Sequence, residues 1–165
     1  MALHLKNLTI LVVEDNTHMR KLLVEVLRAL GVGQVFQADG GQKALQLLRH
    51  ERTDIIITDW QMSPMDGLEM TEIIRQDNRN PSRYVPIIMM TGYSSHEKVA
   101  RARDHGVTEF LVKPFTVDGL AKRLVHVINA PRSFVATPVY QGPDRRRKRL
   151  DDNKPTRRNN DKKTP

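Results

Sequence analysis

The sequence predicts a doubly wound α/β domain built on a parallel sheet of five strands. Short runs of branched apolar residues alternate along the chain with longer segments of helical periodicity. Each run is apolar throughout, which is typical of a strand buried on both faces of a parallel sheet. The clearest run is residues 55–57, three isoleucines between Asp54 and Thr58-Asp59. We therefore expect helices on both faces of the sheet.

The first part of the chain supplies two further strands and two helices. Residues 8–13 are a continuous apolar run and predict a buried strand. Residues 17–30 carry Met, Leu and Val side chains at helical spacing, and Gly31 ends that pattern. Residues 35–36 predict a short strand, and residues 40–50 predict a second helix with one apolar face.

The second part of the chain continues the alternation. Helix and strand signals follow one another without interruption as far as Ala130. Five strand–helix units in this order are typical of a doubly wound domain with flavodoxin-like topology. The expected elements are a helix at 67–76, a strand at 84–90, a helix at 95–105, a strand at 107–112 and a helix at 116–129.

The composition limits the classes of protein that the chain can belong to. An apolar content of 39% is enough for a buried core. Cysteine is absent, which excludes disulfides, thiol nucleophiles and Cys-based metal sites and favours a reducing cytoplasm. No apolar stretch approaches the roughly 18 residues of a membrane span, and the N-terminus carries no targeting signal. We expect a soluble, cytoplasmic protein.

The net charge of +8 is concentrated near the C-terminus. Residues 1–130 hold 16 Lys and Arg against 15 Asp and Glu, whereas residues 131–165 hold 11 against 4. The second segment has few apolar residues, so it should be largely disordered on its own. It is an arginine-rich tail after a domain at 6–130, and four of its residues are apolar enough to dock on another surface. These are Phe134, Val135, Val139 and Tyr140.

Ionisable side chains stand at the ends of the expected strands. Glu14 and Asp15 follow the first strand, and Asp59 ends the third. Thr91 ends the fourth strand, and Lys113 follows the fifth. Because the carboxyl ends of parallel strands share one edge of the sheet, these side chains should meet there. For Asp59 alone, a helix cap or a turn is the structural alternative.

The convergence of these groups predicts phosphorus chemistry. Three crowded carboxylates repel one another, and an oxygen-rich site of this kind suits Mg²⁺. An ionised Asp59 can attack phosphorus and form an aspartyl phosphate. Lys113 and the hydroxyl of Thr91 would then neutralise and hydrogen-bond the phosphoryl oxygens.

Residues 6–130 resemble the receiver domain of CheY-like response regulators. The resemblance implies a CheY-like form of the flavodoxin-like fold and a regulatory protein rather than an enzyme. It also implies that a sensor histidine kinase or a phosphotransfer protein supplies the phosphoryl group. The matching motifs, all in the expected order, are Glu14-Asp15, Thr58-Asp59, Met65-Asp66-Gly67, Met90-Thr91-Gly92 and Val112-Lys113-Pro114-Phe115.

The resemblance also implies roles for individual residues. Asp59 would be the phospho-acceptor, with Thr91 and Lys113 in contact with the phosphoryl group. The Lys113-Pro114 peptide bond is usually cis in this family. The ligands of Mg²⁺ would be Asp15, Asp59, the backbone carbonyl of Gln61 and, through water, Glu14.

Two aromatic residues depart from the pattern of the family. Phe110 stands where the family has an aromatic switch residue that is often Tyr, and Phe has no hydroxyl with which to hydrogen-bond Thr91. Trp60 directly follows the acceptor, where it either shades the site or only packs. A rotamer switch linked to Thr91 could persist here only as packing.

The tail carries residue types that suit a guanine nucleotide. Residues 145–149 are five consecutive cations, and guanidinium groups match both phosphate oxygens and the O6/N7 edge of guanine. Asp144 could accept hydrogen bonds from the N1 and N2 hydrogens of guanine, and Tyr140 offers a stacking face. Cyclic di-GMP, with two guanines and two phosphates, fits this set. A solvated basic arm that contacts nucleic acid or a membrane is the alternative, and of these nucleic acid is disfavoured.

The tail also resembles that of the Cle proteins, CheY-like proteins whose arginine-rich tail binds cyclic di-GMP. These proteins act on the flagellar motor switch and related surface behaviour, so a motor switch protein or a kinase becomes an expected partner. We therefore expect a response regulator whose tail binds cyclic di-GMP to control docking; the alternative is a switch driven by phosphorylation alone. The tail residues implied are Tyr140, Gly142, Pro143, Asp144, Arg145, Arg146, Arg147 and Arg149.

Overall fold

The computed structural model of the chain describes residues 5–92 and 96–146 and contains the predicted parallel sheet. Its five strands are in the order β2-β1-β3-β4-β5, and every neighbouring pair is parallel. This arrangement confirms the predicted fold class. The strands are β1 (Thr9–Val13), β2 (Gln34–Ala38), β3 (Ile55–Asp59), β4 (Ile87–Thr91) and β5 (Glu109–Val112).

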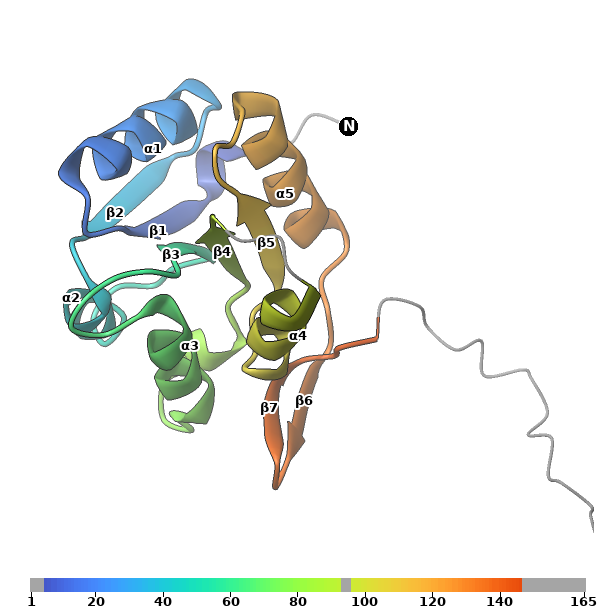
Figure 1. Ribbon diagram of the computed structural model, residues 1–165. Coiled ribbons are helices and arrows are strands. Elements are labelled where there is room, and N and C mark those ends of the chain that lie inside the picture. The colour runs from blue at the N-terminus through green and yellow to red at the C-terminus, as the bar shows by residue number, and fades with distance from the viewer. Residues whose placement is uncertain (1–4, 93–95, 147–165) are drawn as a thin grey trace, which may run out of the picture.

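Helices cover both faces of the sheet (Figure 1). Residues of α1 and α5 pack with one set of strand side chains, and residues of α2 and α3 pack with the other set. The helix α4 contributes to a third cluster with α3 and β5. The helices are α1 (Thr17–Ala29), α2 (Gly41–Leu47), α3 (Gly67–Gln76), α4 (His96–Asp104) and α5 (Val117–Asn129).

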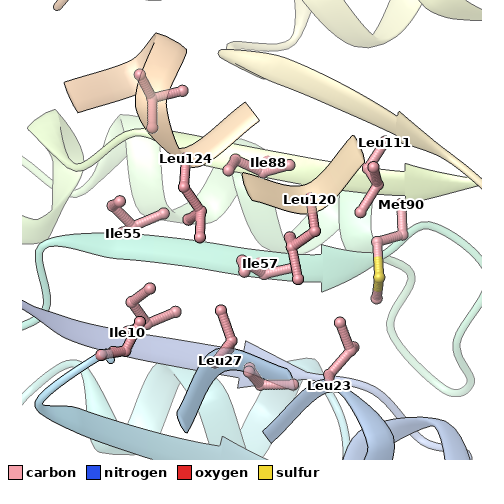
Figure 2. Close-up of a cluster of buried hydrophobic side chains, with 13 residues drawn as sticks. Ile10, Leu23, Leu27, Ile55, Ile57, Ile88, Met90, Leu111, Leu120 and Leu124 are labelled. Carbon is pink, nitrogen blue, oxygen red and sulfur yellow. The ribbon is translucent and has the colours of Figure 1, made fainter. Parts of the chain in front are cut away.

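The core on the α1 and α5 side follows from the alternation of side chains along each strand. Figure 2 shows Ile10, Ile55, Ile57 and Ile88 of the sheet beneath leucines of the two helices. These side chains are essentially inaccessible to solvent. Replacing one such leucine by alanine typically costs about 2–5 kcal/mol. This packing fixes the strand ends, and therefore the residues that follow them, relative to one another.

Helix starts are set by side-chain caps. The side-chain oxygen of Asn16 accepts hydrogen bonds from the backbone N–H groups of His18 and Met19, which begins α1 directly after Asp15. Asp66 and Glu69 form a capping box at the start of α3. Both caps lie in the loops that follow strands of the predicted site.

Two short 3-10 helices, η1 (Leu5–Asn7) and η2 (Pro81–Tyr84), were not predicted. The side chain of Asn80 caps η2, and Pro81 occupies its first turn. Because η2 uses Tyr84, β4 begins at Ile87 and not at residue 84. No helix in the described part of the chain combines the length and the apolar content that a membrane span needs.

The segment after α5 is a folded hairpin over part of its length. The strands β6 (Phe134–Thr137) and β7 (Tyr140–Pro143) pair antiparallel. The prediction of a segment that is largely disordered on its own does not describe these residues in the full chain, because an isolated hairpin is marginal but this one packs on the domain. Residues 147–165 lie outside the described part of the chain, and the predicted domain boundary near Ala130 stays a prediction.

The hairpin docks at the end of α4, a helix that lies well before β6 and β7 in the sequence (Figure 1). Gly142 lies so close to the domain that an added Cβ would be 2.9 Å from the Cα of Gly106. The ring of Phe134 meets that of Tyr84 edge to face at 4.8 Å, and such a pair contributes about 0.5–1.5 kcal/mol. Val139, expected to dock, is 94% exposed at the hairpin turn and does not.

A buried arginine joins the elements beneath the hairpin. The guanidinium of Arg75 donates to the backbone carbonyls of Gly106, Arg83 and Val85 over 3.0, 2.6 and 2.8 Å. Burial lowers the pKa of Arg75 to about 10, so it remains a cation at neutral pH. Arg75 thus ties together the end of α3, η2 and the loop before β5, which form the platform for β7.

Candidate functional site

The predicted carboxylates meet at the carboxyl edge of the sheet. Oxygens of Glu14, Asp15 and Asp59 all lie within 4.8 Å of one another. The backbone holds this edge together, since the N–H of Glu14 donates to the carbonyl of Ala38 over 3.1 Å. The ammonium of Lys113 lies 2.9 Å from Oδ1 of Asp59 and 3.8 Å from Oε2 of Glu14. The predicted convergence of these four side chains is confirmed.

Burial differs strongly among the three carboxylates. Glu14 and Asp59 are 1% and 5% exposed, whereas Asp15 is exposed. Burial raises the pKa of Glu14, a hydrogen bond from the backbone N–H of Asn16 opposes that shift, and the nearby charge of Asp59 adds to it. The carboxylates of Glu14 and Asp59 are therefore shielded from solvent, whereas that of Asp15 beside them is open to it.

The donor set fits a hard cation. Oε2 of Glu14 is buried and, among the described residues, has no hydrogen-bond partner. A buried oxygen in that state is costly unless something coordinates it. Gln61, whose carbonyl was predicted as a ligand, lines a hollow of about 490 Å³ with Asp15 and Asp66. Carboxylate and carbonyl oxygens around solvent-filled space are the ligands that Mg²⁺ prefers.

Gly67 is required by the close approach of α3 to the end of β3. A Cβ on Gly67 would overlap the backbone carbonyl oxygen of Asp59, so no larger residue fits without displacement. The N–H of Gly67 donates to the carbonyl of Trp60 over 2.9 Å, and Thr58 Oγ1 donates to the carbonyl of Asp59 over 3.0 Å. These contacts hold the backbone of Asp59 in one position within the carboxylate cluster.

Helix α1 contributes residues that the sequence analysis missed. A hollow of about 410 Å³ next to Asp59 and Lys113 is also lined by His18, Met19 and Leu22. These residues follow Asp15 at positions i+3, i+4 and i+7, so they share one helix face, and that spacing could have revealed them. They form one wall of the hollow beside the carboxylate cluster.

Arg20 was also missed. Its guanidinium donates to the backbone carbonyl of Glu14 over 2.7 Å and thereby fixes the turn that presents Glu14 and Asp15. A single arginine in the first turn of a helix carries no pattern from which this contact could be predicted.

Comparison with known proteins assigns the family. The profile of the response regulator receiver domain matches residues 10–125. The chain belongs to the response regulator receiver family. Chemotaxis protein CheY-3 of Vibrio cholerae is 35% identical over 119 residues, which is 72% of this chain and 90% of that protein. CheY1 of Helicobacter pylori is 37% identical over 120 residues, 72% of this chain and 95% of that protein.

Solved structures agree with this assignment. The structure of chemotaxis protein CheY4 of Vibrio cholerae matches with a TM-score of 0.68 and 32% identity, over 73% of this chain and 98% of that one. The chain is thus a response regulator of the CheY type, which acts in two-component signalling with a kinase or phosphotransfer partner. Receiver domains bind Mg²⁺ at an acidic site, and here Glu14, Asp15 and Asp59 form the acidic cluster.

The structure also places the other residues that the resemblance singled out. Thr91 is buried at the end of β4, and its carbonyl accepts from the N–H of Lys113 over 2.8 Å. The Lys113-Pro114 bond is cis, as the resemblance implied, and Ser63-Pro64 is also cis, which was not predicted. Phe110 is only 9% exposed and belongs to an apolar cluster against which Trp60 packs.

The tail residues predicted to bind a nucleotide lie on two sides of the hairpin. Arg145 pairs with Asp104 over 2.8 Å, and its guanidinium lies 4.6 Å from the centre of the Tyr140 ring. Tyr140 is 9% exposed, so this ring is placed against the domain and beneath an arginine rather than as an open stacking face. Asp144 and Arg146 instead line a cavity beside α5.

Of the four remaining tail residues predicted to bind a nucleotide, two are buried and two lie outside the described part of the chain. Gly142 and Pro143 are buried, and the carbonyl of Pro143 accepts from the Tyr140 hydroxyl over 2.6 Å. Both therefore act in the hairpin itself. Arg147 and Arg149 lie outside the described residues.

Proposed function

We propose that Asp59 accepts a phosphoryl group and that the arginine-rich tail binds cyclic di-GMP. The two events together would control docking to a protein partner such as the flagellar motor switch. In this proposal the protein is a regulator and not an enzyme, and its phosphodonor is a sensor histidine kinase or a phosphotransfer protein. The observation that carries the first part is the meeting of three carboxylates and Lys113 at one edge of the sheet.

The phosphoryl transfer follows from the chemistry of this edge. A carboxylate oxygen of Asp59 forms a bond to phosphorus while the bond from phosphorus to the donor breaks, and the donor leaves with that electron pair. Lys113, already 2.9 Å from Oδ1, would then pair with a phosphoryl oxygen, with Thr91 as the hydroxyl partner. Mg²⁺ held by Asp15, Asp59, the carbonyl of Gln61 and, through water, Glu14 would offset the negative charge that builds up there.

Labelling by a small phosphodonor tests this part. The parent protein should be phosphorylated in the presence of Mg²⁺, and Asp59→Asn should not be. Asp54→Asn is a matched control, because Asp54 lies just before the same strand and Asn retains an oxygen for the N–H of Thr9. Labelling of Asp59→Asn to the level of the parent would refute the assignment of the acceptor.

The tail proposal rests on a guanidinium-rich segment next to an ionised carboxylate. A hydrogen bond from the backbone N–H of Arg146 holds the pKa of Asp144 below its usual range, and the Arg146 side chain adds to this effect. Asp144 is therefore an acceptor for the N1 and N2 hydrogens of guanine at neutral pH. Arg145 and Arg146 would serve the phosphates of cyclic di-GMP.

Calorimetric titration tests the nucleotide. Cyclic di-GMP should bind the parent, and Arg145→Ala and Arg146→Ala should each weaken binding. Cyclic di-AMP is the control for the base, because adenine lacks the hydrogens that Asp144 would accept. Equal affinity for single-stranded nucleic acid, falling steeply with added salt, would instead support a generic basic arm.

The proposed docking face lies on α4, β5 and α5. It exposes the apolar side chains of Val112 and Val117, which are 46% and 52% accessible. A purified motor switch protein should bind the phosphorylated parent and lose affinity for Val117→Asp. Val139→Asp is the control, since Val139 is exposed at the hairpin turn and outside this face. Equal binding of all three proteins would exclude this face, and no binding by the phosphorylated parent would exclude this partner.

A further inference from the structure

A cavity of about 600 Å³ separates α5 from the base of the hairpin. Its walls come from the start of β5, the C-terminal half of α5 and both ends of the hairpin. It lies at the opposite end of β5 from the receiver site, because Glu109 begins that strand and Lys113 follows its last residue. The ionisable residues that line it are Glu109, Arg123, His126, Arg132, Asp144 and Arg146.

The wall from the domain is organised by Glu109. This carboxylate is 4% exposed, and its Oε1 accepts from the backbone N–H of Phe110 over 3.1 Å. Its oxygens lie 3.6 Å from a guanidinium nitrogen of Arg123 and 3.4 Å from Nε2 of His126. Glu109 is thus a positioning residue that holds two nitrogen-bearing side chains at the edge of the cavity.

The opposite wall comes from the tail. The N–H of Asp144 donates to the carbonyl of Ser133 over 2.7 Å and closes the base of the hairpin. Nε of Arg146 lies 3.4 Å from Oδ1 of Asp144, and Arg132 donates to the Asp144 carbonyl over 3.5 Å. Asp144, Arg146 and Arg132 are therefore held at this wall, while Arg145 pairs with Asp104 elsewhere.

Several of the charged side chains that line the cavity are open to solvent. Ion pairs that only fastened the hairpin would bury their charges against each other, yet Arg123, His126 and Arg146 have side chains 47%, 52% and 70% exposed. Three guanidinium groups and an imidazole face two carboxylates, so the lining favours an anion. The volume is also within the range of about 300–1,000 Å³ typical of small-molecule sites.

We infer that this cavity holds one guanine nucleotide unit of the proposed cyclic di-GMP, with Arg123, His126 and Arg132 as binding residues that lie outside the tail motif. The inference rests on the proposed nucleotide function and assigns its pocket. In this assignment the carboxylate of Asp144 accepts hydrogen bonds from the edge of the guanine base. The guanidinium of Arg123 holds phosphate oxygens from the side of the domain, and that of Arg132 holds them from the base of the hairpin.

Titration of cavity variants with cyclic di-GMP tests this assignment. Arg123→Gln and Arg132→Gln should each weaken binding by about tenfold or more, the loss expected for a charge-assisted hydrogen bond. Arg132→Lys, which keeps the charge but loses the fork, should also bind more weakly than the parent. Lys122→Gln is the matched control, because Lys122 lies on the same helix, is 75% exposed and does not line the cavity.

A second measurement on the parent protein does not depend on how the variants fold. The NMR signals of the His126 ring and of the Arg123 side chain should shift during the titration, and those of Lys122 should not. Binding by the parent without these shifts, or with unchanged affinity in both glutamine variants, overturns the pocket and leaves the tail function intact. A parent that does not bind cyclic di-GMP overturns both.

Discussion

At the scale of single residues, the contact between Gly67 and the backbone of Asp59 sets how precisely Asp59 is held. Gly67→Ala places a methyl group against the Asp59 carbonyl. We expect a loss of about 1–3 kcal/mol in the free energy of unfolding, together with slower phosphorylation. Chemical denaturation and labelling kinetics measure the two effects. Gly40→Ala is the control, because no atom lies within 4 Å of its added Cβ; equal behaviour of the two variants would contradict the steric account.

Asp15 should determine the affinity for Mg²⁺. It is the exposed member of the carboxylate cluster, and it shares a hollow with Trp60, the only tryptophan in the sequence. Tryptophan fluorescence should therefore report Mg²⁺ binding, and Asp15→Asn should weaken that binding by about tenfold or more. Asp118→Asn, an exposed carboxylate paired with Lys122 on α5, should titrate as the parent does. An unchanged affinity in Asp15→Asn would exclude it as a ligand.

At the scale of elements, the hairpin is stabilised by contacts with the domain as well as by its own strand pairing. Arg83 donates to the side chain of Gln141 over 2.6 Å, and its guanidinium lies 5.1 Å from the centre of the Phe134 ring. Arg83→Ala should speed hydrogen exchange across residues 134–143 and leave the five-stranded sheet protected. Arg79→Ala is the control on the same connecting segment. Uniform loss of protection would mean that Arg83 supports the whole fold.

Tyr140 should make hairpin docking sensitive to alkaline pH. Burial raises the pKa of its hydroxyl, which donates to the carbonyl of Pro143. A group whose pKa is raised by folding stabilises the folded state below its unfolded pKa, about 10, and loses that contribution as the pH rises through the folded pKa. Phenolate absorbance, with Tyr140→Phe as reference, should show Tyr140 ionising above pH 10. Ionisation at or below that value would contradict its burial.

The strands and helices were predictable because the signals that specify them are local. An apolar run such as residues 55–57 and a helix-ending glycine such as Gly31 act within a few residues of themselves. Hairpin docking was not predictable in the same way, because its partners Gly106, Arg83 and Tyr84 are distant in sequence. The composition of the tail alone suggested disorder, whereas the domain supplies the surface that its few apolar residues need.

At the scale of the whole molecule, the candidate receiver site and the cavity lie at opposite ends of the sheet. The carboxyl edge could be predicted from four strand ends, since parallel strands bring their carboxyl ends together whatever their exact lengths. The cavity beside α5 could not, because it combines the start of β5 with both ends of a hairpin that was not foreseen. Glu109 gave no sequence signal beyond a single acidic residue in an apolar strand.

The most direct test of the central claim is the divalent-ion dependence of phosphorylation at Asp59. The protein is incubated with a small phosphodonor in the presence of Mg²⁺ or of a chelator and is then digested, and the masses of its peptides are measured by mass spectrometry. We predict that the peptide containing Asp59 gains one phosphoryl group in Mg²⁺ and that labelling is largely lost in the chelator. Equal labelling in both conditions, or labelling of a different peptide, would contradict the account.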